Sequence, residues 1–227
     1  MEKQKSIVII TILLSLTGGY CDTVTFVSTS ELFSAHVTGN FILFAYDLIK
    51  HTDTSSWLKL LSFPIFIIAV IIGGIIVSRS IKTSAILLVE GIILAIIGIV
   101  CIVLSVTGTT VHLWTSYLLA MCVVFSMGLQ NAFGKIYPNE TYGPTTMMTG
   151  NVTQAALDVG KMVKSKTEDL LTKVSLYHQA ITITSFLAGC LFGGLLGKSA
   201  GLSAVLLPGI ALIVYYVVNN KEPASIV

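Results

Sequence analysis

The sequence predicts an all-α integral membrane protein, a polytopic bundle of helices. Hydrophobic residues make up 54% of the 227 residues and charged residues only 11%, and the mean hydropathy is +0.90. A soluble domain carries about 25% charged residues. Several apolar stretches also approach the ~20 residues that a helix needs to cross a bilayer. The lipid bilayer is therefore the first partner that the sequence indicates.

The composition also excludes several classes of function. A formal net charge of +2 is too small to indicate a nucleic-acid partner. The four cysteines are widely spaced in apolar runs, and no two of them have the spacing of metal ligands. No phosphate-binding loop, dinucleotide fingerprint, zinc-protease motif or nucleophile elbow occurs. We therefore expect no metal, no cofactor and no enzymatic activity.

Six stretches are apolar enough to be membrane spans. Asp22 interrupts the first stretch, and Glu90 lies inside the third. From 91 to 134 the chain has no Asp, Glu, Lys or Arg, which two passes joined by a short polar turn explain most simply. The predicted spans are about 6–28, 57–78, 84–106, 113–134, 174–197 and 201–218.

Two further segments, 36–48 and 145–163, are only moderately apolar, and each opens with polar or glycine residues. Both are shorter or more polar than a typical membrane span. They are either re-entrant half-helices or marginal full spans.

The two halves of the chain share a pattern of residues. Asp22 precedes the triplet Thr38-Gly39-Asn40 in the first half, and Asn131 precedes Thr149-Gly150-Asn151 in the second. In both halves an aspartate follows the asparagine of the triplet by seven residues, and a lysine follows it by ten. Matched spacing of this kind indicates an internal repeat. We predict one membrane domain, 1–227, built from repeats at about 7–106 and 112–219.

The two triplet segments decide how the repeats are oriented. If the segments are re-entrant, each repeat crosses three times and the halves are inverted; if they cross fully, the halves are parallel. Lysines and arginines favour the cytoplasmic side. With a cytoplasmic N-terminus, the six-span topology places ten inside and three outside, against nine and four for eight spans. We favour six spans, two re-entrant segments and both termini in the cytoplasm.

The two motifs resemble the signatures of a known family. Gly19 and Asp22, followed by His-Val-Thr-Gly-Asn at 36–40, resemble the first signature of the YoaK family, a bacterial membrane family also called domain of unknown function 1275. Gly-Leu-Gln-Asn at 128–131 with Met-Thr-Gly-Asn at 148–151 is similar to the second signature. The resemblance covers about residues 8–218. It implies a multi-pass protein of the bacterial plasma membrane, and a small-molecule permease with no implied substrate.

Polar groups within the apolar segments are the candidate site. A carboxylate in a bilayer-crossing helix costs about 2.5–3.5 kcal/mol on insertion scales and normally faces a wet cavity or the bundle interior. A helix broken at a triplet exposes free N–H groups and a positive dipole end, which transporters use to hold substrates. We predict a substrate site formed by Asp22, Thr38, Gly39, Asn40, Asn131, Thr149, Gly150 and Asn151. For proton or ion coupling we predict Asp22 and Glu90.

Structural roles for the same residues remain open. Asp22 and Glu90 could be interfacial carboxylates, and the triplets could serve helix packing and hydrogen bonding between helices. Asp47 and Asp158 are expected to form ion pairs at helix ends with Lys50 and Lys161, three residues further on. The alternatives to a permease are a passive channel, an intramembrane enzyme and an accessory membrane protein. A homodimer is also compatible with so few spans.

The six-span topology predicts that Lys50 lies outside the cell, whereas Lys164 lies in the cytoplasm. Lys50→Cys should react with a membrane-impermeant maleimide in right-side-out vesicles only. Lys164→Cys is the matched control and should react in inside-out vesicles only, and the unsubstituted chain gives the background of its own cysteines. Labelling of Lys50→Cys from the cytoplasmic side would rule this topology out.

Overall fold

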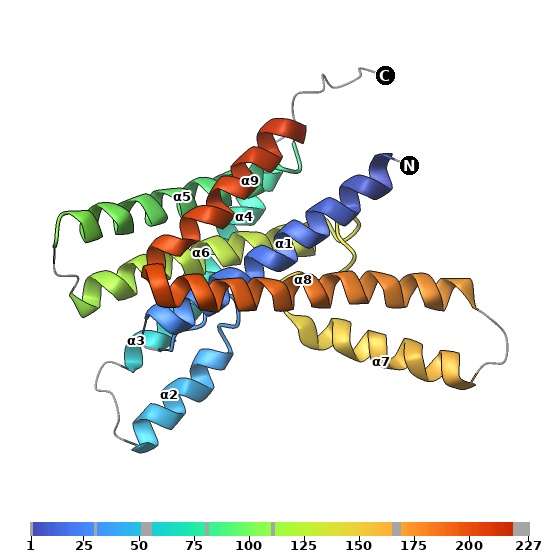
Figure 1. The fold of residues 1–227 in the computed structure, drawn as a ribbon, viewed down its shortest axis with the longest axis horizontal. Helices are drawn as coiled ribbons and strands as arrows, with labels where there is room; N and C mark the ends of the chain where they lie inside the picture. Colours follow the sequence, from blue (N-terminus) through green and yellow to red (C-terminus); the bar gives the residue numbers. More distant parts are fainter. Residues whose placement is uncertain are drawn as a thin grey trace.

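The structure, a computed structural model, describes residues 2–29, 31–50, 56–79, 82–109, 112–164 and 169–219, and these form only helices and loops (Figure 1). In chain order the elements are α1 (Glu2–Ser28), α2 (Gly39–Lys50), α3 (Trp57–Leu60), α4 (Ser62–Arg79), α5 (Ala85–Val106), α6 (Leu113–Ile136), α7 (Met148–Lys164), α8 (Leu170–Ala200), the 3-10 helix η1 (Gly201–Val205) and α9 (Leu206–Asn219). The prediction of an all-α bundle is confirmed.

Five helical stretches among the described residues are long and apolar enough to cross a membrane. The last of them, Leu170–Asn219, contains α8, η1 and α9. The chain turns back after α8 at Gly201, whose φ of +61° favours glycine (Figure 1). Residues 201–205, which we predicted to begin the last span, form the 3-10 helix instead, and α8 begins earlier than predicted. The protein is therefore a polytopic membrane bundle.

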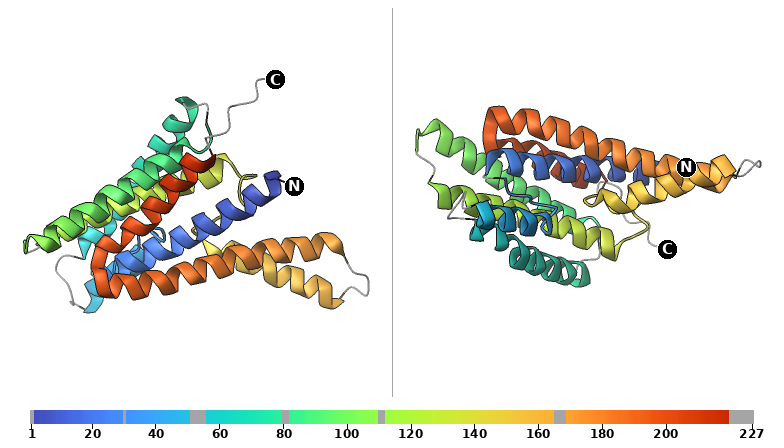
Figure 2. Two further views of the ribbon diagram at one scale, coloured as in Figure 1. Left: turned by 45° about the horizontal axis from the view of Figure 1, so that its top comes forward. Right: turned by 90° about the horizontal axis from the view of Figure 1, so that it is seen from below.

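The helices α2 and α7 begin at the two triplets, α2 at Gly39 and α7 at Met148, near the middle of the molecule (Figure 1). They leave the centre of the molecule in different directions, each towards the end where the helix before it stops (Figures 1 and 2). With 12 and 17 residues, they are about 18 and 26 Å long, less than the ~30 Å of a hydrocarbon core. Their lengths and starting points are those of half-helices.

Helices from the first half of the sequence pack against helices from the second half, and the pairs α1–α8 and α4–α6 match each other when the halves are exchanged. The first helix of the first half, α1, packs on α8, and the first helix of the second half, α6, packs on α4. The last helices of the halves, α5 and α9, pack together. Because α1 and α6 are the most buried of the long helices, the residues that they carry lie at the centre of the bundle.

Glycines allow these helices to approach closely. A Cβ atom on Gly193 of α8 would collide with the carbonyl oxygen of Tyr20 on α1. A Cβ on Gly73 of α4 would lie 2.7 Å from the Cβ of Ala132 on α6. Where α5 crosses α9, a Cβ on Gly91 would lie 3.0 Å from the oxygen of Gly209, and a Cβ on Gly209 would lie 2.9 Å from the oxygen of Gly91. Larger residues at these crossings would push the helices apart.

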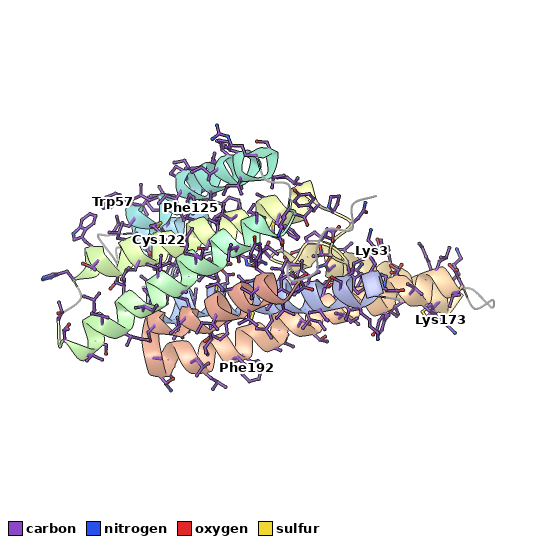
Figure 3. The ribbon with its side chains drawn as sticks, turned by 90° about the horizontal axis from the view of Figure 1, so that it is seen from above. Lys3, Trp57, Cys122, Phe125, Lys173 and Phe192 are labelled. Carbon is purple, nitrogen blue, oxygen red and sulfur yellow. The ribbon has the colours of Figure 1, made fainter. Side chains whose placement is uncertain are left out.

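The outer surface has the side chains expected of a membrane protein. Trp57 and Trp114 are both largely exposed and lie with their ring centroids 5.6 Å apart. Lys3 and Lys173 lie towards the opposite end of the molecule from Trp57, and Phe192 points outward from α8 (Figure 3). Aromatic side chains at one end and lysines at the other suit the two interfaces of a bilayer.

Candidate functional site

The first triplet is held in place by Asn40, which is fully buried. Its Oδ1 accepts a hydrogen bond from the N–H of Phe33 at 2.9 Å, and its Nδ2 donates to the oxygen of Phe33 at 2.9 Å. The same Nδ2 donates to the hydroxyl of Ser62 at 2.9 Å. Asn40 therefore ties the loop before α2 to the start of α4, and its polar atoms are occupied within the protein.

Asp22 holds the other side of the same loop. Its Oδ1 accepts hydrogen bonds from the N–H groups of Ala35 at 2.7 Å and His36 at 3.3 Å. Its Oδ2 lies 2.5 Å from Nδ1 of His36. His36 lies outside the five apolar helices, and its hydrogen bond to the Asp22 carboxylate raises the pKa of His36 above the ordinary value of 6.5. Although His36 belongs to the first signature, we did not predict its contact with Asp22, because only the folded loop brings the two side chains together.

The second triplet is held by fewer hydrogen bonds. Nδ2 of Asn151 donates to the oxygen of Pro144 at 2.7 Å, seven residues earlier, as Asn40 does to Phe33. Proline has no N–H, so the return hydrogen bond that Phe33 provides cannot form here. Asn131 stands where Asp22 stands in the first half, and its Oδ1 accepts a hydrogen bond from the hydroxyl of Thr146 at 2.8 Å.

The starts of α2 and α7 also differ. The N–H groups of Gly39, Asn40 and Phe41 donate to the backbone oxygens of residues 36, 37 and 38, at 2.8–3.2 Å. Within the described part of the chain, the N–H groups at 148–150 form no such hydrogen bonds with the loop before α7. The first turn of α7 consequently has N–H groups available to a ligand.

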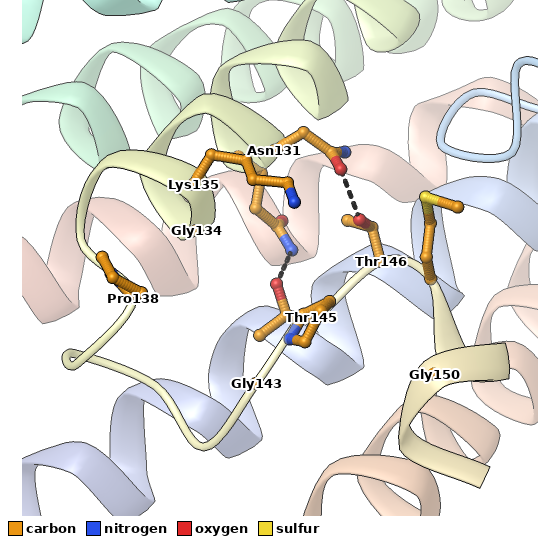
Figure 4. A pocket seen from close by; sticks show the side chains of 11 residues that line it. Asn131, Gly134, Lys135, Pro138, Gly143, Thr145, Thr146 and Gly150 are labelled. Atoms are coloured by element: carbon orange, nitrogen blue, oxygen red, sulfur yellow. Dashed lines mark hydrogen bonds between the residues drawn. The ribbon is translucent and has the colours of Figure 1, made fainter. Parts of the chain in front are cut away.

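A cavity of about 530 Å³ opens where α6 ends, between the loop and the start of α7 (Figure 4). Its lining consists of Gln130, Asn131, Gly134, Lys135, Pro138, Gly143, Pro144, Thr145, Thr146, Met147 and Gly150. Lys135 is the one charged residue in this lining. Nε2 of Gln130 donates to the hydroxyl of Thr145 at 2.9 Å and to the oxygen of Leu14 at 2.8 Å.

Only some of the residues that we predicted to bind substrate line the cavity. Asn131 and Gly150 line the cavity. Thr38 and Thr149 are exposed. Gly39 packs against the ring of Phe33, because a Cβ atom on Gly39 would lie 3.1 Å from the ring. Asp22, Asn40 and Asn151 make the hydrogen bonds within the loops described above. Gln130, Lys135, Thr145 and Thr146 line the cavity but were not predicted, because only the folded loop brings them together.

Glu90 of α5 does not line this cavity and lies near Cys21 of α1. Its side chain is fully buried next to Gly91, and neither carboxyl oxygen has a hydrogen-bond partner among the described residues. An ionised carboxylate without a partner is costly to bury. A buried acid without a structural partner is a candidate for a functional group.

Our expectation for the aspartates that follow the triplets was wrong. Asp47 pairs with Lys59, with 2.6 Å between its Oδ2 and the lysine Nζ, rather than with Lys50. Asp158 accepts a hydrogen bond from the hydroxyl of Ser175 at 2.6 Å. In both cases one partner belongs to the next helix, because α2 packs on α3 and α7 packs on α8. Asp158 also accepts a hydrogen bond at 2.8 Å from Nε2 of Gln154 on its own helix.

These features define a polytopic α-helical membrane protein with two short helices, α2 and α7, and a cavity with polar lining residues beside one of them. A family described as protein of unknown function (DUF1275) matches residues 10–218, and the chain belongs to this family. No curated protein and no solved structure matches the chain. The family resemblance stated from the two motifs is confirmed.

The pairing of His36 with Asp22 predicts a pH-dependent contribution to stability. Because the pKa of His36 is raised in the folded protein, this contribution is complete below about pH 6.5 and is lost as the pH rises through the raised value. The melting temperature of His36→Gln in detergent should therefore fall furthest below wild type at about pH 6 and approach it at about pH 9.

Asp22→Asn provides the matched background for this measurement. Without the carboxylate, His36→Gln should change the melting temperature by the same amount at every pH, as a double-mutant cycle would reveal. A pH-independent difference in the wild-type background would show that the ion pair does not stabilise the fold.

Proposed function

We propose that this protein is a small-molecule permease, a secondary transporter with its site at the interface of the two triplet segments. One observation carries the proposal: α7 begins beside an open cavity with polar side chains in its lining. Within the described part of the chain, the N–H groups at the start of α7 form no hydrogen bonds with the loop before it. Broken helices of this kind are the substrate sites of transporters with repeat architecture. Membership of a family of unknown function is compatible with this activity and does not assign it.

We further propose that the halves are inverted repeats. This is supported by the exchanged packing of α1 on α8 and α6 on α4, and by the reciprocal contact of Gly91 with Gly209. An inverted pair of half-helices gives a transporter two related gates, one towards each side of the membrane.

In a single state of a transport cycle, one gate is closed and the other is open. The two triplet segments differ in the same way. The first loop is closed by Asn40, Asp22 and His36, while the second lies beside the cavity. In the other state, the loop before α7 would close and the Asp22–His36 contact would open. The expected location is the bacterial plasma membrane with a cytoplasmic N-terminus. α6 runs towards the side of the molecule that carries the N-terminus (Figure 1), so the cavity at its end would then open to the cytoplasm.

The permease proposal can be tested by a ligand screen followed by an uptake measurement. Amino acids, nucleobases, sugars, organic acids and drugs are tested for a rise in the melting temperature of the purified protein, because a ligand that binds only the folded state stabilises it. The best ligand is then followed into proteoliposomes. A permease should give saturable uptake and exchange of internal for external ligand. Uptake that does not saturate would indicate a channel, and the absence of any uptake would overturn the proposal.

A substitution in the cavity provides a sharper prediction. A side chain at Gly150 would enter free space beside the cavity, since no atom lies within 4 Å of its Cβ position. Gly150→Phe should therefore fold normally and reduce uptake about tenfold or more. Gly160→Phe is the matched control on the same helix, because nothing lies within 4 Å of that position either. Equal uptake by the two variants would exclude this cavity from the transport path.

Glu90 is the proposed proton-coupling group, because it is buried and has no hydrogen-bond partner in the described part of the chain. Glu90→Gln keeps the size of the side chain and removes its ability to exchange a proton. Uptake driven by a proton gradient should be lost, while exchange of ligand across the membrane continues. Glu31→Gln, at an exposed position, is the control. Gradient-driven uptake by Glu90→Gln at the wild-type rate would contradict this role.

A further inference from the structure

We propose that the cavity beside α7 binds a small organic carboxylate that also carries a hydrogen-bond donor, such as a hydroxy acid or an amino acid. The inference deepens the proposed function and rests on it only for the step in which the ligand crosses the membrane. The binding itself is argued from the charge, the hydrogen-bonding groups and the size of the cavity.

The charge of the cavity is positive. Lys135 lies at its edge, forms no ion pair within the described ranges and meets no acidic residue in the lining (Figure 4). The start of α7 adds the positive end of a 17-residue helix, with Met147 and Gly150 at the cavity wall. An anion would therefore find both a cation and N–H donors here.

The first half of the chain shows what kind of anion suits a triplet loop. There, the carboxylate of Asp22 accepts hydrogen bonds from the loop amides of Ala35 and His36. In the second half the equivalent residue is Asn131, which is neutral. Four residues further on, Phe26 in the first half is replaced by Lys135 in the second. The second loop thus has a cation in place of its own carboxylate, and a ligand carboxylate would supply the missing charge.

A second observation points to a ligand with a donor group. Gln130 lines the cavity and is fully buried, and its Oε1 has no hydrogen-bond partner in the part of the chain that the structure describes. Its Nε2 is already used by Thr145 and Leu14. A buried acceptor without a donor is costly, and an ammonium or hydroxyl group on the ligand would satisfy it.

The size and charge of the cavity narrow the ligand further. A volume of about 530 Å³ lies in the range of ~300–1,000 Å³ that small-molecule sites occupy. One lysine balances one carboxylate, whereas a phosphate dianion would keep a charge uncompensated. The same anion chemistry could come from a lipid headgroup, so the experiment includes that source.

The test uses the full-length protein purified in detergent, at constant ionic strength. Lactate and serine carry both a carboxylate and a donor, propionate lacks the donor, and lactamide lacks the negative charge. Lactate or serine should raise the melting temperature in a saturable way, propionate less, and lactamide not at all. Phosphatidylglycerol added to the micelles forms the lipid arm.

Two variants assign the effect to this cavity. Lys135→Gln should weaken the apparent affinity about tenfold or more, and Lys164→Gln, on the exposed end of α7, should not change it. Asn131→Asp places in the second half the carboxylate that the first half already has, and should also prevent carboxylate binding.

Each outcome decides between the proposals. Stabilisation that Lys135→Gln does not weaken, equal stabilisation by lactamide, or no stabilisation by any of these compounds would overturn the inference. Stabilisation by phosphatidylglycerol alone would assign the site to a lipid headgroup and overturn it too. Binding that depends on Lys135, together with no uptake into proteoliposomes, would keep the carboxylate site and reject the permease.

Discussion

The constraint on which this fold depends is the need to satisfy non-helical backbone inside a membrane bundle. Two loops, before α2 and before α7, pass into the region between the long helices. Backbone polar groups at membrane depth must find partners within the protein or in a wet cavity. The asparagine of each triplet meets this need by bonding to the chain seven residues earlier, Asn40 at Phe33 and Asn151 at Pro144. The triplets are thus structural first, and any substrate site is built around them.

The same constraint explains why the two loops are held by different hydrogen bonds although their motifs match. In the first half, Asp22 and Asn40 use their polar atoms on the loop, so the loop is closed with little left for a ligand. In the second half, a proline replaces an N–H donor and an asparagine replaces the aspartate, so fewer bonds hold the loop. The polar groups that remain face a cavity. These differences in sequence leave the first loop closed by hydrogen bonds and the second loop beside a cavity.

The long apolar helices were predictable, and the roles of the polar residues were only partly so. α5 and α6 were predicted within one or two residues of their ends, because uninterrupted apolar runs end at polar turns. The start of α8 was predicted four residues too late, because the first turn of the helix contains the charged Lys173. Asp22 was correctly recognised as a buried acid, but not its contact with His36. The ion pair between Asp47 and Lys59 was not predicted, because it forms only when α3 packs against α2.

The sequence by itself determined the fold class, the repeated motifs and the membership of a membrane family, because hydropathy and residue spacing are local properties of the chain. The tertiary structure alone decided which polar side chains are consumed by the loops and which face the cavity. That depends on contacts between residues far apart in the sequence, such as Gln130 with Leu14. Such contacts form only when α1 and α6 meet at the centre of the bundle.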